Sequence, residues 1–270
     1  MKDQSRSRAS AQGRASIPVL RVVAWSVLIA SALVAVFLVY NRIERFLIRD
    51  ERFALSGPDG SQEGQTLDIQ GASHVSKRAV EAVFSEDLGR SVYLIPLTDR
   101  RANLRSVDWV KDASVARMWP NRLQVRIEER VPVAFVTLGS SRASSARFGL
   151  IDEDGMILPP TPDRFGLPVL AGVKRSDSLA QRAERVHRMM RLLRELGDQG
   201  RNLSEIDVSD PDDVTIMEPR DGRVLKLLLG DRNFALRYRN FVTHYAEIVE
   251  RLPGAVTLDL RLEDRITVVE

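Results

Sequence analysis

The feature that most constrains this chain is a run of 19 residues without a charged side chain, Val22–Tyr40. At about 1.5 Å per residue, a helix of this length spans roughly 28 Å, close to the hydrocarbon thickness of a bilayer. A cleaved signal peptide is the alternative, but its apolar region usually has only about 7 to 15 residues. The small-residue stretch Ala30–Ala32 also lies inside the run rather than after it. The run therefore predicts one uncleaved transmembrane helix, residues 22–40.

The flanks of this helix predict its orientation. Five Lys/Arg residues precede it and four follow it closely, so positive charge leans toward a cytoplasmic N-terminus. Residues 1–21 are then a short cytoplasmic tail. Residues 41–65 form a membrane-proximal segment whose end, Ser56–Gln65, has the Gly, Pro and Ser content of a linker. The rest of the chain is expected on the extracytoplasmic side.

Composition narrows the functions open to the folded part. The chain has 270 residues, 44% of them hydrophobic, which is enough for a sizeable core. It contains no cysteine, and therefore no disulfide framework and no thiolate nucleophile. Residues 1–52 hold nine Lys/Arg against four Asp/Glu, while the remainder holds 31 against 33. The folded part lacks a basic footprint, so no nucleic acid is expected as a partner.

The clearest secondary structure is a strand, a turn and a strand within Val110–Val136. Apolar side chains alternate with polar ones from Leu123 to Glu128, which places one face of a strand in a core and the other in water. The preceding segment Trp119–Arg122 contains the Pro and Asn of a tight turn. A β-hairpin is the simplest interpretation.

Upstream of the hairpin, the pattern predicts one strand and two helices. Thr66–Gly71 alternates like a short strand and ends in a glycine turn. Ser76 can cap a helix that ends at Gly89, and a shorter helix ends at Arg105. The predicted order is strand, helix, helix, strand, strand.

This order and the hairpin residues resemble the POTRA domain of the FtsQ/DivIB family of bacterial cell-division proteins. The resemblance is carried by Gly71 and by residues 110–134, which read V-x-x-A-x-V-x-R-x-W-P-x-x-L-x-V-x-I-x-E-R-x-P-V-A. It implies a POTRA domain at residues 66–132. The linker before Thr66 departs from the family, in which the membrane-proximal segment usually runs straight into the first strand.

The end of the hairpin is a candidate site. The resemblance makes this strand end a partner-docking site or a domain junction, formed by Glu129, Arg130 and Pro132. A solvated strand end is the alternative for the two charged residues. Beyond Pro132 the chain leaves the first sheet.

Residues 133–270 predict a mixed β domain with flanking helices, so the fold class is α+β behind a single N-terminal transmembrane helix. Helices are expected at Ala180–Leu196 and Asn233–Leu252, whose apolar stripes face a core. Asp154-Gly155 predicts a hairpin turn, and Gly139–Ala146 a loop. The expected strands are Val133–Leu138, Phe148–Asp152, Met156–Leu158, Leu203–Val208, Val214–Met217, Val224–Leu229 and a closing segment, Val256–Val269.

The closing segment supplies the predicted partner site. Thr257–Arg261 resembles the V-D-L-R strand of the family, whose outer strand pairs edge-on with small single-pass coiled-coil division proteins. The resemblance implies the partner-binding residues Thr257, Leu258, Asp259, Leu260, Arg261, Leu262, Ile266 and Val268. A strand that only completes the core is the alternative. This chain also has Leu262 where the family often has an aromatic residue, and Glu263–Arg265 in place of a glycine-containing turn.

The sequence contains no clear motif for catalysis, cofactor binding or metal binding. The three histidines are scattered, and no phosphate loop or nucleophile motif occurs, so neither metal, cofactor, small-molecule substrate nor catalysis is expected. The resemblance implies an inner-membrane scaffold of the divisome at the septum. Two alternatives stay open. A membrane-tethered periplasmic enzyme or ligand sensor requires a pocket of converging polar groups. A POTRA-type transport or assembly factor requires repeated POTRA units and a long β-barrel, for which the chain is short.

Overall fold

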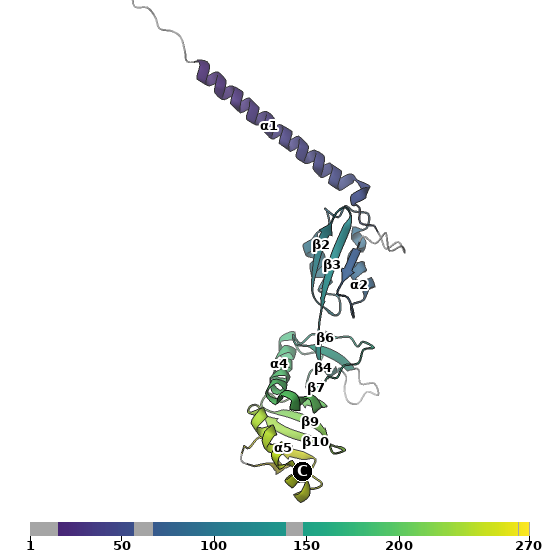
Figure 1. Ribbon diagram of the computed structural model, residues 1–270, viewed down its shortest axis with the longest axis vertical. Coiled ribbons are helices and arrows are strands. Elements are labelled where there is room, and N and C mark those ends of the chain that lie inside the picture. Colours follow the sequence, from purple (N-terminus) through teal and green to yellow (C-terminus); the bar gives the residue numbers. More distant parts are fainter. Residues whose placement is uncertain (1–15, 57–66, 139–147, 264, 270) are drawn as a thin grey trace, which may run out of the picture. The chain divides into compact units, whose positions relative to one another are not determined.

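The computed structural model describes residues 16–56, 67–138, 148–263 and 265–269, and confirms the α+β fold class (Figure 1). Most of the predicted cytoplasmic tail and linker, and the loop Gly139–Ala146, lie outside the described residues. The predicted domain limits stay a prediction. Contacts between residues divide the chain into two compact units. The first comprises the residues up to Asp68, Phe84–Leu97 and Val115–Gln124. The second comprises Ile69–Val83, Thr98–Ser114 and the residues from Val125 onward.

The N-terminal helix α1 (Ser16–Arg49) has 34 residues and contains the whole predicted span. Its stretch Arg21–Ile48 is long and apolar enough to cross a membrane. The side chains from Arg21 to Tyr40 are exposed, as a lipid-facing helix requires. A 3-10 turn, η1 (Glu51–Phe53), follows α1, and the Asp50 carboxylate caps it by accepting a hydrogen bond from the Arg52 N–H at 3.0 Å.

A three-stranded sheet with the strand order β1-β3-β2 follows. Its elements appear in the predicted order: β1 (Leu67–Gln70), α2 (Lys77–Val83), η3 (Ser85–Asp87), α3 (Leu97–Leu104), β2 (Val110–Met118) and β3 (Arg122–Glu129). The alternation in β3 is confirmed, because Leu123, Val125 and Ile127 are buried.

One prediction in this region was wrong in extent. The helix after Ser76 ends at Val83 instead of Gly89. Phe84 leaves helical geometry with φ −101° and ψ 6°, and its side chain is buried. A short 3-10 turn then carries the chain to Gly89, whose φ of +76° suits glycine. Burial of the aromatic ring therefore overrides the helical pattern.

The remaining strands form one nine-stranded sheet with the order β12-β11-β10-β9-β8-β7-β4-β5-β6. Its strands are β4 (Pro132–Thr137), β5 (Phe148–Asp152), β6 (Ile157–Leu158), β7 (Val169–Ala171), β8 (Glu205–Asp207), β9 (Val214–Arg220), β10 (Arg223–Gly230), β11 (Thr257–Asp259) and β12 (Thr267–Val268). The predicted Asp154-Gly155 turn joins the antiparallel pair β5 and β6.

Two helices connect parallel neighbours in this sheet. α4 (Leu179–Leu196), extended by the 3-10 helix η4 (Gly197–Asn202), links β7 to β8, and α5 (Phe234–Arg251) links β10 to β11. A parallel pair needs such a crossover, and crossovers of the same hand place both helices on one face. Figure 1 shows both helices on the same side of the strands. Their apolar stripes join the main core, with Val186, Met189, Leu192, Leu196, Phe234, Tyr238 and Phe241 buried.

Candidate functional site

The first candidate site is the C-terminal edge of the nine-stranded sheet. β11 lies inside the sheet, since it pairs in parallel with β10 and antiparallel with β12. Among the described residues no strand covers the outer side of β12. The Val269 N–H donates to the Thr257 carbonyl at 3.1 Å. Because successive residues of a strand direct their backbone groups to opposite sides, the N–H and C=O of Val268 point outward.

The predicted partner-binding residues fall into an inner and an outer group. Leu258 and Leu260 are each 1% exposed and belong to the core, and Ile266 packs partly against it. Leu262 and Val268 are exposed. A partner at this edge can therefore touch the side chains of the outer group and the backbone of β12.

Arg261 lies after β11 and is engaged within the chain. Its guanidinium donates to the Asp259 carboxylate at 2.9 and 2.6 Å, and its backbone N–H donates to the same carboxylate at 2.9 Å. The third guanidinium nitrogen, Nη1, lies 3.6 Å from a carboxylate oxygen of Asp213. The hydrogen bond from Arg261 lowers the pKa of Asp259 against the opposing effect of burial. These contacts fix the start of the turn between β11 and β12.

Glu263 follows Arg261 by two residues and was not among the predicted site residues. Its carboxylate accepts a hydrogen bond from the Asn233 amide at 2.6 Å, and its backbone carbonyl accepts one from Asn240 at 3.3 Å. Both asparagines belong to the α5 region, so the turn is tied to that helix. A hollow of about 500 Å³ lies between α5 and the turn, with Leu262 and Ile266 in its lining.

The second candidate site is the end of β3, where Glu129 holds a turn. One carboxylate oxygen accepts hydrogen bonds from the backbone N–H groups of Ser73, His74 and Val75 at 2.7, 2.7 and 2.8 Å. The other oxygen lies 2.8 Å from Nδ1 of His74. Burial opposes ionisation of Glu129, but the hydrogen bonds outweigh it and lower the pKa of this carboxyl. Glu129 thus joins β3 to the turn before α2.

His74 is held from three sides. Besides Glu129, it has Asp163 as a partner, with 2.9 Å between Nε2 and a carboxylate oxygen. Its ring stacks on Trp109 with the centroids 4.7 Å apart and the planes at 16°. The hydrogen bond from His74 to Glu129, with support from Asp163, raises the pKa of His74 above its ordinary value although burial opposes this. When the ring is protonated, it donates from both nitrogens and has no free base position.

Arg130 and Pro132 lie where the chain passes from β3 to β4. The Arg130 N–H donates to the Trp109 carbonyl at 2.8 Å, and its Nε donates to the Val110 carbonyl at 3.2 Å. Its Nη1 donates to Asp152, a buried carboxylate on β5. Pro132 pairs with Asp152 in the register of β4 and β5. The structure therefore places Glu129 and Arg130 in two hydrogen-bond networks; a partner at this site stays a prediction.

A buried carboxylate, that of Glu218 on β9, also serves the fold. Glu218 accepts hydrogen bonds from Arg220 at 2.6 Å and from the Tyr238 hydroxyl at 2.9 Å. Burial, reinforced by the Glu218 charge, raises the pKa of Tyr238 to about 12. Arg220 also lies over the ring of Tyr245, 4.9 Å from its centroid. These groups satisfy one another, which is how a buried carboxylate is normally accommodated.

The three-stranded sheet and its two helices define a POTRA-bearing protein. Residues 65–130 match the family model described as POTRA domain, FtsQ-type. The similarity to known proteins extends well past this domain. The cell division protein FtsQ of Koribacter versatilis is 33% identical over 223 residues, which cover 80% of this chain and 60% of that protein. FtsQ of Nitrosospira multiformis is 28% identical over 189 residues, covering 70% of this chain and 72% of that protein.

A third relative, FtsQ of Bordetella pertussis, is 35% identical over 91 residues, about a third of each chain. The chain thus spans less than two thirds of the length of the Koribacter protein. The chain therefore carries a POTRA domain of the FtsQ type and is similar to FtsQ proteins beyond this domain.

Replacing Glu129 by Ala should lower the free energy of unfolding by about 3 kcal/mol, because three backbone donors lose their acceptor. Urea denaturation followed by tryptophan fluorescence measures this, since Trp109 lies against the His74 turn. Glu128→Ala is the matched control: its side chain is exposed on the same strand, and its effect should stay within about 0.5 kcal/mol. Equal effects of the two substitutions would contradict the anchoring role of Glu129.

The His74 imidazole should titrate above its ordinary pKa of 6.5 in an NMR titration, and Glu129→Gln should shift the midpoint downward. A pKa raised on folding adds stability that is full below pH 6.5 and is lost as the pH rises through the folded-state value. The native chain should therefore lose this contribution above pH 6.5, whereas His74→Gln should not show that loss. A midpoint at or below 6.5 contradicts the ion pair.

Proposed function

We propose that this chain is a single-pass inner-membrane protein that assembles the division machinery at the septum. The observation that carries the proposal is its similarity to FtsQ of Koribacter versatilis over 80% of this chain, which reaches beyond the POTRA domain. The function is one of protein-protein contact and not of catalysis. In support, the titratable groups described above with shifted pKa values are hydrogen-bonded or ion-paired within the chain.

In this proposal α1 crosses the membrane once. The span Arg21–Ile48 has the necessary length and composition. The excess of basic residues before the helix favours a cytoplasmic N-terminus, although by one residue only. Both sheets then lie in the periplasm, where a division protein meets the extracytoplasmic segments of its partners.

The partners are small single-pass coiled-coil division proteins, and the contact is strand addition at β12. An incoming strand forms hydrogen bonds with the outward N–H and C=O of Val268. These backbone hydrogen bonds supply affinity that does not depend on the side chains of the partner. Leu262 and the hollow beside it offer apolar contact for alternate residues of that strand. The hydrogen bonds of Arg261 and Glu263 within the chain hold Leu262 between them in place.

A fluorescent fusion of the full chain, expressed in cells depleted of their own FtsQ-family protein, tests the proposed function. We expect enrichment at division sites and restored septation. Uniform membrane signal with continued filamentation would overturn the proposal. Correct insertion is verified separately by resistance of the fusion to carbonate extraction.

Replacing Val268 by Pro should weaken partner pairing about tenfold, because proline removes the outward donor of the edge. The bonds between β11 and β12 survive, since they use Val269 and Thr257. Val268→Ala keeps the N–H and removes only side-chain atoms, so it is the matched control and should retain most of the affinity. Binding of the purified chain to a coiled-coil division protein measures both variants; equal affinities would exclude pairing through this edge.

A further inference from the structure

We propose that the tip of the β2–β3 hairpin, Met118–Arg122, rests in the lipid headgroup layer of the membrane that α1 crosses. This inference depends on the proposed transmembrane anchoring and adds a second contact with the bilayer. The observations that carry it come from the first compact unit, in which both α1 and the hairpin tip lie.

The hairpin tip presents an apolar surface that the described part of the chain leaves open. Trp119 is 77% exposed, more than any other large apolar side chain described, and the neighbouring Met118 is exposed as well. Residues 115–124 include two arginines and no acidic residue. An exposed tryptophan beside basic residues is typical of protein segments at the membrane-water interface.

One loop segment, residues 91–95, forms hydrogen bonds with both the hairpin and the end of α1. Arg117, at the end of β2, donates hydrogen bonds to the carbonyls of Val92 and Ile95, both at 2.7 Å. The Ser91 hydroxyl in turn donates to the carbonyl of Leu47 on α1 at 2.7 Å. The hairpin tip is therefore connected to the last turns of the helix through one short segment, residues 91–95.

The junction of this segment with α1 lies close to the expected membrane surface. Leu47 is seven residues beyond Tyr40, a rise of about 10 Å. The headgroup layer extends roughly 5–8 Å beyond the hydrocarbon on each side, and a tilted helix travels farther within it. Ile43 and Phe46 keep the helix surface apolar past Tyr40.

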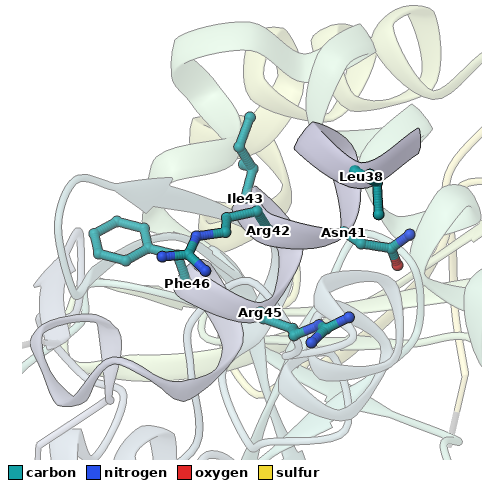
Figure 2. Close-up of a pocket in the computed structure, with 6 residues that line it drawn as sticks. All are labelled: Leu38, Asn41, Arg42, Ile43, Arg45 and Phe46. Carbon is teal, nitrogen blue, oxygen red and sulfur yellow. The ribbon is translucent and has the colours of Figure 1, made fainter. Parts of the chain in front are cut away.

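Figure 2 shows the last turns of α1, where Arg42 and Arg45 extend from the helix in different directions. Long basic side chains near a helix end can reach headgroups while their stems stay in the apolar layer. The loop adds further exposed apolar side chains at Leu88, Tyr93 and Leu94. Residues 41–49 hold three arginines against one glutamate, so the helix end shares with the hairpin tip the mixed apolar and basic character that a headgroup layer accommodates. This continuity with α1 is the reason to assign lipid as the occupant.

The chain has no cysteine, so single cysteines can carry a fluorophore in the full-length protein. We would label Asn121→Cys at the tip, with Glu128→Cys as a control on β3, six residues and about 20 Å beyond Arg122. Ala32→Cys reports insertion of α1. The proteins are reconstituted in vesicles of phosphatidylethanolamine and phosphatidylglycerol that contain lipids with a nitroxide on the headgroup or on the acyl chain.

We expect headgroup nitroxide to quench the label at position 121 at least about twofold more than the label at 128. Adding Trp119→Ser should reduce quenching at 121 to the level at 128 without unfolding the chain, because this side chain is exposed. Val131→Ser, at a residue that is 73% exposed beyond the other end of β3, should leave the quenching at 121 unchanged.

Two outcomes would overturn the inference. Equal quenching at positions 121 and 128, with the label at position 32 quenched by acyl-chain nitroxide, means that α1 is inserted but the hairpin stays in water. Shielding of position 121 from aqueous iodide without quenching by lipid nitroxide means that a protein, such as a second copy, covers the tip. If position 32 is not quenched by the acyl-chain probe, the transmembrane anchoring itself is refuted.

Discussion

A single carboxylate, that of Glu129, determines how the first sheet ends. Three consecutive backbone N–H groups, those of Ser73, His74 and Val75, converge on one of its oxygens. Unpaired donors of this kind are unfavourable away from water, so the turn before α2 depends on an acceptor supplied from a strand more than fifty residues away. A carboxylate suits this position because its second oxygen stays available for His74.

The neighbouring residue extends the same constraint to the second sheet. Successive side chains of a strand point to opposite sides, so Glu129 and Arg130 reach different elements although they are adjacent. Arg130 contacts the buried Asp152, whose other oxygen accepts the Met156 N–H at 2.7 Å and so supports the turn between β5 and β6. Two adjacent residues at one strand end therefore organise the turn before α2 and the beginning of β4 and β5.

Local signals were predictable from the sequence, and distant pairings were not. The uncharged run became α1, and the alternation after Trp119 became β3, because both patterns express burial within a few residues. The hydrogen bond between Glu129 and His74 joins residues 55 positions apart, and the one between Glu263 and Asn233 joins residues 30 positions apart. A periodic pattern of local residues cannot predict such pairs. The edge position of β12 likewise depends on the order of nine strands.

The C-terminal edge shows how rigidity and exposure are combined at a proposed partner site. β12 has only two residues, and a short edge strand limits unspecific pairing with other chains. Before it, Arg261 is bonded to Asp259, and Glu263 is bonded to Asn233. An ordered edge loses little conformational entropy on binding, so the ordering cost falls mainly on the incoming strand. Selectivity must then come from the side chains that meet Leu262 and the hollow beside α5, because backbone pairing alone does not distinguish one strand from another.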